Sequence, residues 1–166
     1  MLRTGVDALQ LNPSAVRHHA TSPSERGRMK TPIPELVSAY LRTVTRTGPQ
    51  SADEEDDDPD FWAFSEVSDR MRPSSDPGEA WDLVTTLVDA AAESLDIVAA
   101  GPLEEFVRCF GARAMDQIEA RAAEDPKFTT ALGWIWLDTD ELTPELLERV
   151  VRASGGQIKP LERRKS

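Results

Sequence analysis

Two adjacent carboxylates beside a Gly-Pro pair are the clearest candidates for chemistry in this sequence. Glu104 and Glu105 follow Gly101, Pro102 and Leu103. At the third position of a helix, a carboxylate can bond back toward the N-cap and is favoured by the helix dipole. General acid–base catalysis would instead require a partner side chain facing it, and no His or Ser lies nearby in the sequence. We therefore expect Glu104 to cap a helix, with catalysis as the alternative.

The remaining nucleophilic and metal-binding side chains are poorly placed for chemistry. Cys109 lies between Phe106 and Phe110 in an apolar helical pattern, where a thiol usually acts as a small buried hydrophobe. His18 and His19 are adjacent in a polar arm, which is a poor arrangement for metal binding or catalysis. The chain contains no GxxxxGK, GxGxxG, HExxH or GxSxG sequence. We predict no catalytic residue, no cofactor site and no metal site.

The tryptophans are the candidates for binding another molecule. Trp62, Trp81 and Trp136 fall on or near apolar stripes of helical spacing, so they are expected in the core. Trp134 is offset from its apolar neighbours and is expected at the edge of the core, either as core or as an exposed binding anchor. Together with the turn before the two carboxylates, it defines a candidate interaction surface consisting of Gly101, Pro102, Glu104, Glu105 and Trp134.

Prolines mark the beginnings of the elements that must position these residues. Proline has no backbone N–H to lose at the first position of a helix, and its fixed φ suits that position. An Asp or Thr before it can accept a bond from a free N–H of the first turn, and Gly also suits the cap. An apolar pattern of helical period follows each of five such pairs. The pairs are Asp58-Pro59, Asp76-Pro77, Gly101-Pro102, Asp125-Pro126 and Thr143-Pro144.

Apolar spacing predicts an all-α fold, since no segment alternates long enough for a strand. Gly111 is expected to end one helix in a left-handed cap, and Gly155-Gly156 to end the last. Short connections favour a compact array of antiparallel helical hairpins, arranged as a bundle or a small HEAT-like solenoid. The predicted helices cover residues 34–46, 59–72, 77–92, 94–100, 102–110, 112–124, 126–137 and about 144–154.

Composition divides the chain into a folded body and polar arms. All four Trp and all five Phe lie within residues 61–154. Met29 opens the orderly part of the sequence and is a candidate for the biological start. The predicted organisation is a disordered basic arm over 1–30, a short amphipathic helix over 31–50, an acidic linker over 51–58, a helical domain over 59–154 and a disordered basic tail over 155–166.

The charge of the chain limits its partners. The net charge is −11, and residues 61–154 carry nineteen acidic against eight basic side chains. Phosphate backbones would repel such a domain, so we expect no nucleic-acid binding through it. An acidic surface suits either simple solubility or a basic protein partner. Three features favour a soluble cytoplasmic protein outside the membrane. The chain has a single cysteine, no apolar run near eighteen residues and no signal-like apolar N-terminus.

Five segments in order give the chain a resemblance to a known family. The chain resembles a bacterial family of small helical proteins of unknown function over about residues 35–137, and the Ala-Gly-Pro-Leu-Glu turn is the most specific feature. It departs from that family in its long arms and in Glu105, where Asp is more usual. The resemblance implies a helical fold and no activity. The matching segments are Asp60–Ala63, Asp76–Trp81, Ala99–Glu105, Asp125–Phe128, and Ala131–Gly133 leading to Trp136.

These observations favour a non-enzymatic helical interaction module. One concrete form is an immunity or antitoxin-like protein that covers a basic partner, since charge complementarity speeds association. One alternative is an enzyme of unrecognised type that uses clustered carboxylates, such as Glu104 with Asp76 or Asp125. Another is an oligomerisation element.

Overall fold

The computed structural model describes residues 30–47, 58–137 and 142–158, and every regular element within these ranges is helical. This confirms the predicted all-α fold. The expectations for Met29, the basic arm, the acidic linker and the basic tail concern residues that lie almost entirely outside the described ranges. The helices are α1 (Ile33–Thr47), α2 (Trp62–Arg70), α3 (Pro77–Ala90), α4 (Leu95–Val98), the π-helical turn η3 (Ala99–Leu103), α5 (Glu104–Glu124), α6 (Pro126–Leu132) and α7 (Pro144–Ala153).

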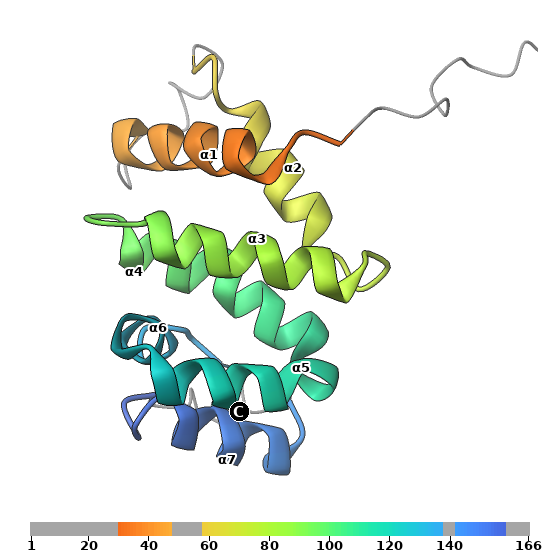
Figure 1. Ribbon diagram of the computed structural model, residues 1–166, viewed down its shortest axis with the longest axis vertical. Coiled ribbons are helices and arrows are strands. Elements are labelled where there is room, and N and C mark those ends of the chain that lie inside the picture. Colours follow the sequence, from red (N-terminus) through yellow and green to blue (C-terminus); the bar gives the residue numbers. More distant parts are fainter. Residues whose placement is uncertain (1–29, 48–57, 138–141, 159–166) are drawn as a thin grey trace, which may run out of the picture. The chain divides into compact units, whose positions relative to one another are not determined.

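The helices are stacked in the order of the chain. Helix α1 packs on α2 and α3, α3 packs on α5 and α6, and α5 packs on α7. Figure 1 shows α1 and α7 at opposite ends of this stack. A single apolar core runs through the layers from Leu36 to Ile158. The arrangement is therefore layered, like a short solenoid, and helix α1 belongs to the same compact unit as the other helices.

Three of the five proline pairs begin helices as predicted. Asp76 Oδ1 accepts the Glu79 N–H at 2.8 Å at the start of α3. Asp125 Oδ1 accepts the Lys127 N–H at 2.9 Å at the start of α6. Thr143 caps α7 in the same way. In each case the cap bonds a backbone group two or three residues away, so local sequence is enough to fix it.

The prediction that Asp58-Pro59 begins a helix is wrong. Helix α2 begins at Trp62, and no side chain caps it. Asp58 Oδ1 instead accepts the Asp60 N–H at 2.9 Å and pairs with Arg46 of α1. The carboxylate is therefore used to attach this turn to α1, a contact that local sequence does not reveal.

The prediction that Gly101-Pro102 begins a helix is also wrong. Helix α4 runs through η3 into α5 without a break, and Pro102 is buried inside it. A proline normally clashes with the carbonyl four residues earlier. The π-turn removes this conflict by widening the helix, and the Glu104 N–H donates to the Ala99 carbonyl five residues back.

Gly111 does not end a helix, contrary to prediction. It lies buried in the middle of α5, where a Cβ atom would stand 3.4 Å from Leu146 Cδ2 of α7. That distance is ordinary van der Waals contact, so Gly111 belongs to the packing surface between α5 and α7 and not to a left-handed turn. Gly155 and Gly156 do adopt positive φ after α7, as expected from the sequence.

Bonds to arginine side chains help hold two carboxylates, Glu119 and Glu66, in their charged form. Hydrogen bonds from Arg149 lower the pKa of Glu119, with Arg149 Nη2 2.7 Å from Glu119 Oε2. Burial raises the pKa of Glu66, but hydrogen bonds from Thr31 and Arg70 outweigh it, so the net shift is downward. In both cases the folded-state pKa lies below the unfolded-state pKa. The resulting stabilisation is present above the unfolded-state pKa and is lost as the pH falls through the folded-state value.

Acid is therefore expected to weaken the fold in a way that depends on Arg149. The melting temperature of the wild type should fall between about pH 5 and pH 2, as the paired carboxylates take up protons. The variant Arg149→Met, which removes the ion pairs of Arg149 with Asp116 and Glu119, should melt lower at pH 7 and show a shallower decline in acid. Circular dichroism melts at a series of pH values measure both. Equal acid slopes for the two proteins would contradict the role of this pair.

Candidate functional site

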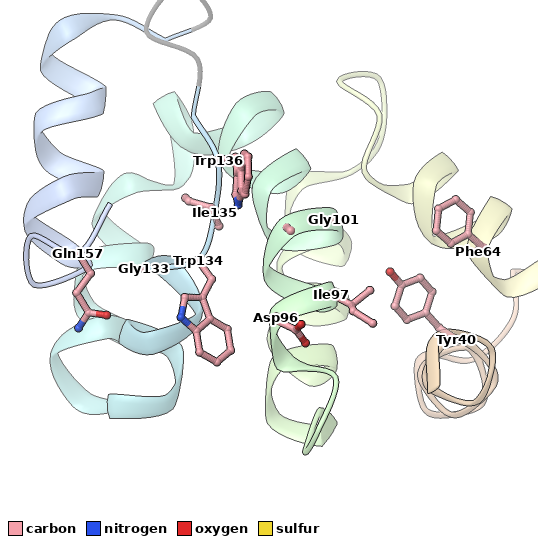
Figure 2. A pocket seen from close by; sticks show the side chains of 11 residues that line it. Tyr40, Phe64, Asp96, Ile97, Gly101, Gly133, Trp134, Ile135, Trp136 and Gln157 are labelled. Atoms are coloured by element: carbon pink, nitrogen blue, oxygen red, sulfur yellow. The ribbon is translucent and has the colours of Figure 1, made fainter. Parts of the chain in front are cut away.

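An open groove crosses the helix formed by α4 and η3. Its volume is about 860 Å³. Figure 2 shows that its lining comes from four places: α1 and α2 on one side, the α4–η3 helix in the middle, and the segments after α6 and after α7 on the other. The lining residues are Tyr40, Phe64, Asp96, Ile97, Ala100, Gly101, Gly133, Trp134, Ile135, Trp136 and Gln157.

The π-turn makes the floor of the groove. Ala100 and Gly101 face it with little side-chain bulk. A Cβ atom on Gly101 would stand 3.6 Å from the Tyr40 hydroxyl oxygen, so even a methyl group would fill space there. π-bulges occur often at functional sites, because they shift the helix face locally. Pro102, directly below, is the residue that requires this local widening.

Stacked aromatic rings form one wall. The ring of Phe64 on α2 stacks between Tyr40 on α1, at 6.1 Å between centroids, and Phe61, at 6.0 Å. Tyr40 is buried, and burial raises its pKa, so the hydroxyl stays protonated. Phe64 keeps 45% of its surface exposed. This wall is therefore apolar and presents one ring to solvent.

The opposite wall is formed by the segment after α6. The prediction that the helix after Asp125 extends to residue 137 is wrong. Helix α6 ends at Leu132, and the chain continues without helical structure. Burial then alternates: Trp134 and Trp136 are 44% and 65% exposed, whereas Ile135 is buried. Trp134 is thus exposed, one of the two placements considered for it. The prediction that Trp136 lies in the core is wrong, because an extended backbone turns alternate side chains to opposite sides.

Glu104 holds this wall in place, so its predicted capping role is wrong. Its Oε2 atom accepts the Trp136 N–H at 2.9 Å. Because η3 and α5 form one continuous helix, no helix start exists at Glu104. The carboxylate instead satisfies a backbone donor of the segment that carries the two exposed indoles. It positions the wall and connects it to the π-turn.

A second cavity of about 400 Å³ continues the groove along η3 and α5. It shares Tyr40, Phe64, Ala100 and Gly101 with the first and is also lined by Pro102, Glu104, Glu105 and Arg108. Glu105 pairs with Arg108 and lies 3.3 Å from Cys109 Sγ. Burial raises the pKa of the Cys109 thiol despite the nearby Arg108 charge, which does not favour a reactive thiolate.

The carboxylates of the enzymatic alternative engage separate partners. Asp76 caps α3 and Asp125 caps α6. Neither residue lines the main groove or the second cavity. Burial raises the pKa of Asp125, but backbone hydrogen bonds from Lys127 and Phe128 outweigh it and lower the pKa overall. These carboxylates are thus used in helix capping and in fixing the groove wall. Among the described residues, no three His, Cys, Asp or Glu side chains are grouped so that they could hold a metal ion.

The structure brings the predicted surface residues to one region. Gly101 and Trp134 line the main groove, and Pro102, Glu104 and Glu105 line its continuation. Sequence reasoning missed Tyr40, Phe64, Trp136 and Asp96. The spacing of Trp134 and Trp136 by two residues was the available signal, since it is typical of an extended segment with one exposed face. Trp62, expected in the core, is 41% exposed on α2 and lines neither cavity.

Comparison with known proteins identifies a family. The model of the family of unknown function DUF6869 matches residues 50–158. The match confirms the resemblance to a family of unknown function and places it somewhat later in the chain than predicted. No curated protein and no solved structure matches the chain. Within the described ranges, no helix has both the length and the apolar character needed to cross a membrane.

Proposed function

The chain belongs to the family of unknown function DUF6869, and we propose that it is a non-enzymatic interaction module whose groove binds a segment of a basic protein. One observation carries this proposal: three large exposed side chains, Phe64, Trp134 and Trp136, gather around the same groove. Exposed aromatic side chains lose favourable burial unless a partner covers them. Clusters of this kind often mark protein interaction sites.

The identity of the exposed residues supports a binding role. Tryptophan is enriched among the side chains that contribute most to protein interfaces, because it buries a large area with few rotatable bonds. The groove has a floor of small residues, and its two indole side chains project from a wall that Glu104 fixes. A partner would therefore meet a largely prearranged surface and lose less entropy on binding.

The charge of the chain supports a basic partner. A net charge of −11 would attract a basic protein and raise its association rate. In its concrete form, the proposal is a cytoplasmic immunity or antitoxin-like protein that covers a basic effector. The engagement of Glu104, Asp76 and Asp125 in structural hydrogen bonds favours this over an enzyme.

Selection of peptides from a phage-displayed library of twelve-residue sequences tests the proposal. The wild type should enrich peptides that bind the groove, and the double variant Trp134→Ala/Trp136→Ala should bind them at least about thirtyfold more weakly, as expected when interface anchors are lost. Fluorescence anisotropy of a labelled peptide measures the affinity. Because both tryptophans have exposed side chains and lie outside the helices, the variant should keep the circular dichroism spectrum of the wild type.

Trp62→Ala is the matched control, since Trp62 is similarly exposed but lines neither cavity. It should leave peptide binding unchanged. Enrichment of no peptide, or equal loss of binding in the control and the double variant, would rule out the groove as the binding site. A protein that forms dimers only while Trp134 and Trp136 are present would indicate self-assembly instead.

A further inference from the structure

One carboxylate in the groove has a different environment from the others. Asp96 lies on α4 with an exposed side chain and lines the main cavity. Figure 2 shows the Asp96 carboxylate across from the Trp134 indole, with Ile97 beside it. An acidic group therefore lies next to a large exposed aromatic ring in a lining that is otherwise uncharged.

The other charged groups along the groove already have partners. Glu104 accepts the Trp136 N–H, and Glu105 pairs with Arg108. Arg72, in the second cavity, lies 2.7 Å from Asp69. The Asp96 carboxylate, by contrast, makes no hydrogen bond or ion pair with another residue in the part of the chain that the structure describes. Its negative charge is available to a ligand.

We propose that Asp96 and Trp134 form a subsite for an arginine side chain of the bound partner segment. The guanidinium lies against the Trp134 indole and donates hydrogen bonds to the Asp96 carboxylate. A planar, weakly hydrated guanidinium can stack on an aromatic ring and bond a carboxylate with two parallel N–H groups at once. Tryptophan gives the strongest cation–π attraction of the aromatic side chains.

This subsite deepens the proposed function and rests on it. It names the chemistry by which a basic partner is recognised: an arginine at the Asp96 end of the groove and apolar side chains toward Trp136 and Phe64. The acidity of the chain attracts the partner from a distance, and the Asp96 charge selects one residue of it. Lysine fits less well, because its compact ammonium is strongly hydrated and cannot form the same planar pair.

The test uses the most enriched peptide from the phage library and two synthetic forms of it, with arginine replaced by lysine or by uncharged citrulline. Wild-type protein should bind the citrulline form at least about tenfold more weakly, the loss expected for one charge-assisted hydrogen-bonded contact. The lysine form should fall between the two. Asp96→Asn should bind the arginine form as weakly as the wild type binds the citrulline form, and should no longer distinguish the two.

Asp82→Asn is the matched control. It removes the same charge from an exposed site on α3 that lines neither cavity, so it should leave all three affinities unchanged. Equal weakening by Asp82→Asn and Asp96→Asn would show a general charge effect and overturn the subsite.

The outcomes separate this inference from the proposed function. The subsite would be overturned if the selected peptides need Trp134 and Trp136 but contain no arginine. It would also be overturned if neither citrulline in the peptide nor Asp96→Asn in the protein weakened binding. In both cases the groove would remain a binding site. Failure to select any groove-dependent peptide would overturn both. Dimerisation that the double tryptophan variant abolishes, measured by light scattering, would make a second copy of the chain the occupant and also overturn the subsite.

Discussion

Replacing Arg70 with methionine is expected to lower the free energy of unfolding by about 3–5 kcal/mol, the usual cost of removing one partner from a buried ion pair. The Arg70 side chain is only 6% exposed. Its Nη2 atom donates to the Thr31 carbonyl at 2.6 Å and pairs with Glu66, and its Nη1 atom lies 3.3 Å from Glu79 Oε1. One guanidinium thus connects the start of α1 to α2 and α3. Methionine removes the guanidinium that contacts the partly buried carboxylates of Glu66 and Glu79.

Arg72→Met is the control for the Arg70 variant. Arg72 has a side chain that is 68% exposed and pairs with Asp69 on the surface. Surface pairs contribute little, so this change should alter the free energy of unfolding by no more than about 0.5 kcal/mol. Urea denaturation followed by circular dichroism measures both variants. Similar losses in the two would show that the stability of the α1–α2–α3 layer does not depend on the buried guanidinium.

Phe106→Ala is expected to cost about 3–5 kcal/mol, as large-to-small changes of buried aromatic residues usually do. Phe106 lies on α5 with no exposed surface. Its ring centroid is 5.5 Å from that of Trp81 on α3 and 5.4 Å from that of Phe110. Trp81 in turn contacts Phe128 on α6 edge to face. Alanine would leave a void between α3, α5 and α6. These helices are already closely packed and cannot move enough to fill it.

Phe64→Ala provides the contrast within the same residue type. Phe64 is 45% exposed and is held by stacking on two rings, so its loss should cost only about 1–1.5 kcal/mol of stability. It should nevertheless weaken peptide binding, because the ring forms part of the groove. Phe106→Ala should therefore mainly lower stability, whereas Phe64→Ala should mainly weaken peptide binding. A larger stability loss for Phe64→Ala, measured by urea denaturation, would contradict this division.

The starts of α3, α6 and α7 could be predicted because their signals are local. Asp76, Asp125 and Thr143 each bond a backbone N–H within three residues, and the proline that follows suits the first helical position. No distant residue has to be known for such a cap to form. The apolar spacing after each cap then gave the buried face of the helix.

The same reasoning failed where distant contacts changed the use of a residue. Pro102 lies inside a continuous helix because the π-turn accommodates it. Gly111 lies in the packing surface between α5 and α7 and not in a turn. Asp58 pairs with Arg46 instead of capping α2. Contact with a neighbouring helix distinguishes the two possible uses of Gly111 and Asp58, whereas the geometry of its own helix does so for Pro102.

The sequence by itself determined that this chain is helical and acidic and where three of its helices begin. These properties follow from local hydrogen bonding, composition and apolar period. Only the tertiary structure decided that Trp136 is exposed, that Glu104 fixes the groove wall and that Tyr40 and Phe64 face the same groove. The stacking of helices brings these distant segments together, and the packing between layers, which no short stretch of sequence encodes, determines which side chains remain at the surface.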